Sequence, residues 1–212
     1  MNRLDGRVER GNRTRRTVLR RAVDIASVEG LEALSVGRLA GELELSKSGV
    51  FALFGSKQEL QLATVREASR IFVTEVLEPA SGATSGVARL WALCEGWLRY
   101  SERRVFPGGC FFYGVMAEFD AREGPVHDAL VDAQRAWLAE LERCAEQARA
   151  ADELGADPDP EQLAFEVVAL METANAMSVL HREAAPYARA RRGIAARLRW
   201  AATDPAAMPQ AP

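Results

Sequence analysis

Two lysines stand where a cation would meet a phosphate. Of the 27 Lys and Arg residues in the chain, only Lys47 and Lys57 are lysines. Each falls in the first turn of a predicted helix, where the helix dipole does not favour positive charge. A phosphate lying across both helix starts would explain them, because free backbone N–H groups and a cation would converge on one anion. The alternative is chance placement of two surface lysines.

A second group of cations lies near the N-terminus. Residues 1–21 hold eight arginines against two acidic residues, although the whole chain has a net charge of −3. A basic end on an acidic body favours an acidic partner at that end, and a solvated tail is the alternative. Arginine suits a nucleic-acid backbone or a narrow minor groove. The candidate arginines are Arg3, Arg7, Arg10, Arg13, Arg15 and Arg16.

The elements that must position these cations are short helices. Residues 1–12 have no period and are expected to form a flexible arm. An apolar stripe from Thr14 predicts a helix that ends at Gly30, because glycine commonly follows the last helical residue. Ser35 and Ser46 then cap two further short helices, separated by a tight turn. This spacing predicts a helix-turn-helix unit, whose last helix would enter the major groove, and an ordinary helical core is the alternative.

Residues 13–66 resemble the DNA-binding region of the tetracycline-repressor (TetR) family of transcriptional regulators. The matching positions are Gly30, Ser35, Leu39-Ala40, Ser46-Lys47-Ser48-Gly49, Phe51, Phe54 and Ser56-Lys57-Gln58-Glu59-Leu60. The resemblance implies that Ser35 and Lys57 meet phosphates. It also implies that Lys47, Ser48 and Gly49, after the cap Ser46, begin the recognition helix.

The same region contains one more implied DNA contact and positions at which this sequence departs from the family. Phe51 matches an aromatic that packs near the DNA backbone, where many members of the family have tyrosine, and Phe cannot donate a hydrogen bond to phosphate. Glu42 and Glu44 put negative charge near the DNA, so they must turn away from it or weaken binding. With Arg13 and Arg16 of the arm, the expected DNA-binding residues are Ser35, Ser46, Lys47, Ser48, Gly49, Phe51, Lys57, Arg13 and Arg16.

The rest of the chain also reads as helices. Ser56 and Glu59 form a capping box that opens a long helix over about 56–78, and the remaining patterns bring the total to about nine helices, with no confident strand. We therefore expect an all-α fold with an arm (1–12), a three-helix DNA-binding domain (13–60) and an effector-binding and dimerisation domain (61–202), joined by the helix at 56–78. The tail, 203–212, is expected to be disordered.

Aromatic residues are concentrated in the expected second domain. A pocket for a small organic molecule needs such walls and a few polar groups, and a plain aromatic core is the alternative. Glu118 and His181 are further polar candidates. The candidate ligand-binding residues are Trp91, Cys94, Trp97, Phe111, Tyr113, Met116, Trp137, Met171 and Asn175.

The last two predicted helices, 161–182 and 186–200, match the pair through which this family forms homodimers. Ala174, Ala176 and Ser178 would permit close helix approach. A two-fold dimer would set two recognition helices about one DNA turn apart and predicts a palindromic operator. The expected partners are therefore double-stranded DNA, a small organic effector and a second copy of the chain, with no membrane.

Other chemistry finds little support in the sequence. The spacing of His127 and His181 with the three cysteines does not suit zinc, and no phosphate-binding glycine loop or nucleophile elbow occurs. We expect no enzyme activity, no metal, no cofactor and a cytoplasmic location. Two alternatives to a ligand-released repressor remain: a thiol-sensing regulator that uses Cys110, which begins a predicted helix, and a helical small-molecule-binding protein without DNA binding.

Overall fold

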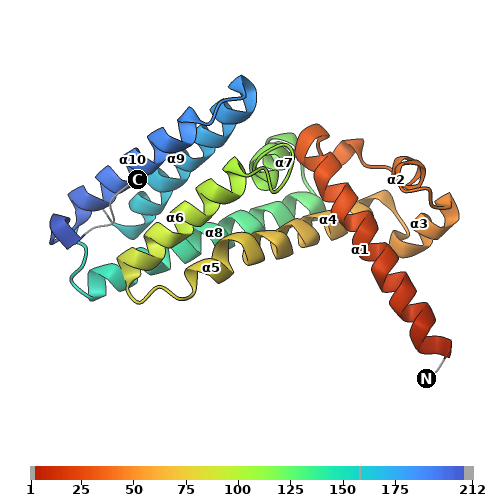
Figure 1. Ribbon diagram of the computed structural model, residues 1–212, viewed down its shortest axis with the longest axis horizontal. Helices are drawn as coiled ribbons and strands as arrows, with labels where there is room; N and C mark the ends of the chain where they lie inside the picture. Colours follow the sequence, from red (N-terminus) through yellow and green to blue (C-terminus); the bar gives the residue numbers. More distant parts are fainter. Residues whose placement is uncertain (1–2, 158, 208–212) are drawn as a thin grey trace. The chain divides into compact units, whose positions relative to one another are not determined.

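The computed structural model describes residues 3–157 and 159–207, which are almost entirely helical (Figure 1). Within these residues the one β-type pairing is an isolated antiparallel bridge between Leu154 and Ala202. The predicted all-α fold class is confirmed. The chain divides into two compact units, one of residues 1–70 and 106–131 and the other of residues 71–105 and 132–212. The first unit therefore includes a segment, 106–131, that the sequence assigned to the second domain.

The first unit is built around a long helix. Helix α1 (Arg3–Glu29) packs against the 3-10 turn η1 (Leu31–Ala33), α2 (Val36–Glu42), α3 (Lys47–Phe54) and α7 (Phe111–Phe119). The unit also contains most of α4 (Lys57–Phe72) and the start of α8 (Pro125–Ala150). The predicted stripe of α1 is its buried face, since Val18, Ala22, Ile25 and Ala26 are each at most 3% exposed.

Helix α1 begins earlier than the sequence pattern predicted. It starts at Arg3, so residues 3–12 of the expected flexible arm are helical, and residues 1–2 lie outside the described part. The segment contains no proline, and its Arg, Leu and Glu residues have good intrinsic helix propensity, so two glycines do not interrupt the helix. The expected irregular arm was therefore wrong for residues 3–12, because a segment without an apolar period can still be helical.

The second unit consists of the remaining helices. Its elements are η2 (Val73–Leu77), α5 (Glu78–Ala80), α6 (Gly86–Glu102), the rest of α8, α9 (Pro160–His181), α10 (Ala185–Ala201) and η3 (Pro205–Ala207). The helix predicted over 56–78 changes character at Val73, where one π-helical turn precedes Pro79. Proline has no N–H for the helical ladder, and a wide turn accommodates this loss.

Helix α6 packs against both α9 and α10, and these last two helices lie side by side (Figure 1). At its start α6 approaches α8 closely, because a Cβ on Gly86 would lie 2.4 Å from the backbone nitrogen of Ala148. The start of the expected disordered tail is held here, since Thr203 N–H donates to the Glu153 carbonyl at 3.1 Å. Residues 208–212 of that tail lie outside the described part.

Candidate nucleic-acid interface and ligand-binding residues

Serine hydroxyls set the starts of the short helices. Ser35 Oγ accepts from the Arg38 N–H and begins α2, and Ser46 Oγ accepts from the Gly49 N–H and begins α3, both at 3.1 Å. Each bond satisfies a backbone donor that the helix itself leaves unpaired. Gly55 ends α3 with a φ of +76°, in the left-handed region that favours glycine. The predicted helix-turn-helix pair is therefore present, with α2 packed against α3.

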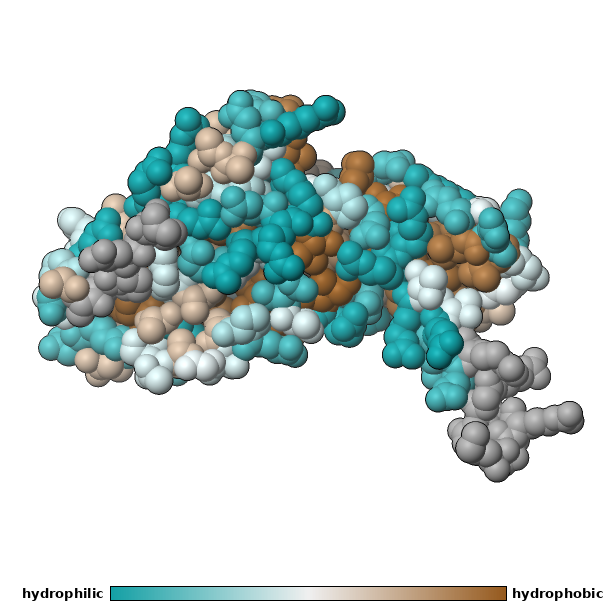
Figure 2. Space-filling view, in the orientation of Figure 1, coloured by the Kyte–Doolittle hydropathy of each residue, from teal (hydrophilic) through white to brown (hydrophobic). Residues whose placement is uncertain are grey.

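Helix α3 has one buried and one exposed face. Val50 and Phe54 are 0% and 7% exposed, whereas Lys47 and Ser48 are exposed. Phe51 lies on the exposed face and is 54% exposed, a large value for an aromatic side chain. Figure 2 shows hydrophobic surface among hydrophilic residues in the region of α2 and α3. The face that a DNA groove would meet thus combines a cation, a hydroxyl and an aromatic ring.

The two lysines differ in their surroundings. The Lys57 ammonium donates to both the carbonyl and a carboxylate oxygen of Glu32, each at 2.8 Å. Hydrogen bonds from Lys57 and Gln61 lower the pKa of the Glu32 carboxyl. Lys47 is exposed, and no acid of the described residues lies within ion-pair distance of it. Only Lys47 therefore presents an uncompensated charge beside the exposed face of α3.

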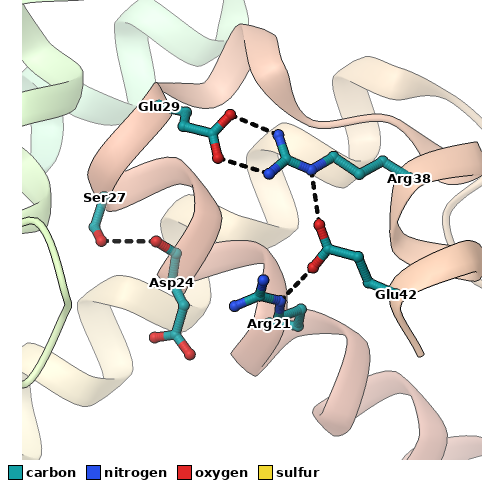
Figure 3. Close-up of polar contacts among 6 residues, drawn as sticks. All are labelled: Arg21, Asp24, Ser27, Glu29, Arg38 and Glu42. Atoms are coloured by element: carbon teal, nitrogen blue, oxygen red, sulfur yellow. Dashed lines mark hydrogen bonds and ion pairs between the residues drawn. The ribbon is translucent and has the colours of Figure 1, made fainter.

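Glu42 is turned toward α1 by a charged network that also includes Arg21, Glu29 and Arg38 (Figure 3). Arg38 donates to both oxygens of Glu29, at 2.7 and 2.6 Å, and to Glu42 at 2.9 Å, and Arg21 also donates to Glu42. These hydrogen bonds lower the pKa of both carboxyls. Two arginines thus compensate the charge of Glu42, whereas Glu44 is exposed at a φ of 54°.

Two expected DNA contacts lie on α1. Arg13 and Arg16 are both exposed. Arg16 also lines a groove of about 420 Å³ between α1 and α4, together with Asn12, Arg15, Leu19, Glu67 and Arg70. The Arg15 guanidinium lies over the ring of Phe54 at 5.0 Å from its centroid. Arginine is therefore prominent along this side of the first unit.

Glu118, a polar candidate for the ligand site, has a structural partner instead. Its carboxylate accepts from the N–H groups of Leu31 and Glu32, at 2.7 and 2.9 Å. Gly30 permits this approach, because a Cβ there would lie 2.5 Å from Glu118 Oε2. The side chain of Glu32 in turn accepts from Lys57. A chain of contacts thus joins α7 to η1 and to the first turn of α4.

The expected ligand-binding residues are divided between the two units. Phe111, Tyr113 and Met116 belong to the first unit, where Tyr113 is 38% exposed. The second unit contains Trp91, Cys94, Trp97, Trp137, Met171 and Asn175. There Phe72 makes edge contacts with Tyr100 and Trp137, with centroids 5.7 and 5.2 Å apart. The second unit therefore has an aromatic cluster to which α6 and α8 contribute.

All three cysteines are buried thiols that form no disulfide within the described residues. Burial raises the pKa of the Cys94 and Cys144 thiols. Cys110 stands at the N-cap of α7 and is 4% exposed. No group of three His, Cys, Asp or Glu side chains within the described ranges could hold a metal ion.

Helix α9 exposes an apolar face. Phe165 is 66% exposed and Leu180 is 79% exposed. Ala169, Glu172 and Ala176 lie between them on the same side at helical spacing, so one half-buried acid interrupts the apolar residues. By length and composition α9 could cross a membrane, a property it shares with core helices of soluble proteins. Burial of Glu172 on this helix raises the pKa of its carboxyl. An apolar helical face of this length normally covers another protein surface.

One polar cluster in the second unit was not predicted from the sequence. Ser101, Arg104, Ser178 and Tyr187 join Asn175 through hydrogen bonds between α6, α9 and α10. Asn175 was the one available signal, as an amide within an apolar helix. The other residues of the cluster lie more than 70 residues away from Asn175 in the sequence or belong to ordinary helical patterns. Nothing in those patterns indicates that these residues form a cluster.

Comparison with known proteins agrees with this organisation. The family model of the tetracyclin repressor-like C-terminal domain matches residues 86–194. A TetR transcriptional regulator from Chloroflexus aurantiacus is similar over 92% of this chain and 98% of its own, with 22% identity and a TM-score of 0.85. A regulator from Cytophaga hutchinsonii covers the same shares, with 19% identity and a TM-score of 0.77.

A structure with bound molecules is also similar. AibR in complex with isovaleryl coenzyme A and operator DNA covers 78% of this chain and 85% of its own, with 19% identity and a TM-score of 0.63. No curated protein sequence matches the chain significantly.

Proposed function

The chain belongs to the tetracycline-repressor (TetR) family of transcriptional regulators, and from this premise we propose that it is a cytoplasmic repressor, released from a palindromic operator by a small organic effector. The observation that carries the DNA-binding part is the exposed face of α3. Lys47, Ser48 and Phe51 face solvent there, while Val50 and Phe54 anchor the helix in the unit's core. A major groove admits such a helix and reads its first residues.

Phosphate contacts are assigned to residues around α3. Ser35, Ser46, Lys47, Gly49 and Lys57 are proposed to contact the backbone at the helix starts. Arg13 and Arg16 are proposed to contact it from α1. For Lys57 this contact must compete with Glu32, which holds the ammonium at 2.8 Å. Lys47 needs no such exchange and is therefore expected to contribute more to affinity than Lys57.

A fluorescence-anisotropy titration with DNA from the chain's own upstream region tests this assignment. Each phosphate contact contributes roughly −0.9 to the slope of log K against log salt. Lys47→Ala should weaken binding and make the slope shallower by about one unit. Arg66→Ala is the matched control, because Arg66 is also an exposed cation of the first unit, 62% exposed. Equal slopes for wild type and Lys47→Ala, or no binding by wild type at low salt, would contradict the proposal.

We propose that the homodimer forms through α9 and α10. Phe165, Leu180 and Trp200 expose 66%, 79% and 64% of their side chains, far more than the buried faces of the same helices. A second copy would cover these surfaces and set two copies of α3 one DNA turn apart. Analytical ultracentrifugation of Leu180→Asp should show monomers, whereas Val73→Asp, at a side chain 40% exposed on η2, should stay dimeric. A dimeric Leu180→Asp would refute this interface.

The effector is proposed to bind among the aromatic residues of the expected set. In the second unit, Trp91 and Trp137 are half-buried and Trp97 is 3% exposed. An effector that prefers the DNA-free form would shift the equilibrium by its differential affinity for the two forms. Release of labelled operator on addition of a ligand, together with quenching of tryptophan fluorescence, would support this part.

A further inference from the structure

A buried polar cluster lies between α6, α9 and α10. Ser101, Asn175, Ser178 and Tyr187 are each at most 2% exposed. Ser101 Oγ lies 2.8 Å from Asn175 Oδ1 and 2.7 Å from Tyr187 Oη. Buried polar groups are costly unless they are hydrogen-bonded, so these bonds fix the orientations of Ser101, Asn175 and Tyr187.

Arg104 completes the cluster. It follows the end of α6 with a φ of 52°, in the left-handed region, which turns the chain sharply after the helix. Its Nη1 donates to the Tyr187 hydroxyl at 2.9 Å and to the Ser101 carbonyl at 3.2 Å, and its Nη2 donates to Ser178 Oγ at 2.9 Å. All three acceptors are neutral oxygens.

Arg104 differs in this respect from other partly buried arginines of the same unit. Arg89 is paired with Glu140 and Arg197 with Glu166, while Arg191 reaches Glu95 and Glu102 at 2.8 and 2.7 Å. For Arg104 no carboxylate of the described chain lies within 4.0 Å. Arg104 is half-buried. Holding a guanidinium partly out of water without a counter-charge is unfavourable, and an anion beside it would reduce that cost.

Arg104 also has N–H groups beyond those that its hydrogen bonds to the cluster use. A guanidinium has five N–H groups, and three of those of Arg104 have partners in the described residues. The remaining two, on Nε and Nη2, match the two oxygens of a carboxylate. A single guanidinium surrounded by hydroxyls suits a monoanion better than a doubly charged phosphate.

We propose that Arg104 is the anion-binding group of the effector site and takes the carboxylate of a small organic acid. The proposal rests on the effector-responsive function argued above. Trp97 lies one turn before Ser101 on α6, and Met171 lies one turn before Asn175 on α9. The polar cluster therefore continues the helical faces that carry two of the expected apolar ligand contacts.

Thermal unfolding of the full chain with a series of carboxylates tests the proposal. The probes are acetate, hexanoate, benzoate and phenylacetate, each compared with its neutral amide and with chloride at equal ionic strength. At least one acid should raise the wild-type melting temperature where its amide does not, because binding to the folded state alone stabilises it. In Arg104→Gln the dissociation constant for that acid should rise about ten- to a hundredfold, as expected for loss of a charged hydrogen-bonding pair.

Two variants separate binding from folding. Arg103→Gln removes an adjacent guanidinium that is 67% exposed, and it should respond like wild type. Arg104→Lys keeps the positive charge but loses the paired N–H groups of the guanidinium, so its affinity for the acid should be intermediate. This variant replaces Arg104→Gln in the test if Arg104→Gln does not fold. A purely structural role for Arg104 predicts lower melting temperatures with an unchanged response to the acid.

The proposal is overturned if no acid exceeds its amide in wild type, or if Arg104→Gln responds as wild type does. The operator titration on the same preparations is a separate readout. Carboxylate binding without DNA binding would contradict the proposed regulator and leave this site standing. DNA binding with no response to any carboxylate would refute this site alone.

Discussion

Replacing Glu118 by alanine removes two charged hydrogen bonds from the junction between α1 and η1. The carboxylate accepts from Leu31 N at 2.7 Å and from Glu32 N at 2.9 Å. After the substitution, the N–H groups of Leu31 and Glu32 must donate to water or remain without an acceptor. The junction also carries Glu32, which holds Lys57 and Gln61, so the loss should loosen the start of α4 as well.

The magnitude follows from these two bonds. A hydrogen bond to a charged group contributes about 1.5–3 kcal/mol. Because Glu118 is only half-buried, water replaces part of each bond, and we expect a total loss of about 2–3 kcal/mol in the free energy of unfolding. For a chain of this size, 1 kcal/mol corresponds to about 2–4 °C, so the melting temperature should fall by about 4–12 °C.

Gly30→Ala tests the same junction from the other side. A Cβ at position 30 would lie 2.5 Å from Glu118 Oε2 and 2.8 Å from its Cδ, so the carboxylate must move away. Gly30 also has φ 85° and ψ 166°, a region that is essentially restricted to glycine and costs other residues about 1–3 kcal/mol. In a Glu118→Ala background the steric part disappears and the backbone part remains. Gly30→Ala should therefore cost less in that background than in wild type.

Calorimetry and circular dichroism on the four chains of this double-mutant cycle would measure the coupling. Glu123→Ala is a control, since Glu123 is an exposed acid of the same segment, and its melting temperature should match wild type. The reasoning is refuted if the two substitutions add to within about 0.5 kcal/mol, the limit expected of independent sites. An unchanged melting temperature for Glu118→Ala would refute it as well.

Three further predictions follow from the same structure. Gly86→Ala should destabilise the chain by about 1–3 kcal/mol in chemical denaturation, because its Cβ would meet backbone atoms of Ala148, while Gly82→Ala, with open space around it, should not. Glu172→Gln should stabilise the protein at neutral pH, because burial raises the pKa of this carboxyl above its ordinary 4.5 and folding therefore disfavours its charge. A denaturation series should show the gain fading as the pH falls from neutrality towards 4.5 and absent below it, and a gain that grows over this range would contradict the prediction. Deleting residues 1–12 should lower operator affinity and flatten its salt dependence, and identical slopes in a salt titration would exclude a DNA contact by this segment.

Local signals in the sequence were enough to predict most helices. Ser35, Ser46 and Gly30 act within one helical turn of themselves, so their patterns predict helix ends without knowledge of the rest of the chain. The same locality explains why the two short helices of the helix-turn-helix unit, α2 and α3, were predicted correctly. The boundaries were less certain where the pattern was weak, as at Arg3 and around Pro79.

The sequence by itself determined the all-α class and the helix-turn-helix spacing, since both follow from periodicity and caps. Tertiary structure alone decided the partners of the charged groups. Lys57 meets Glu32 across 25 residues, Glu118 meets Leu31 across 87, and Arg104 meets Tyr187 across 83. An ion pair or a buried hydrogen bond depends on where two distant segments come to lie, and no local period in a single sequence carries that information.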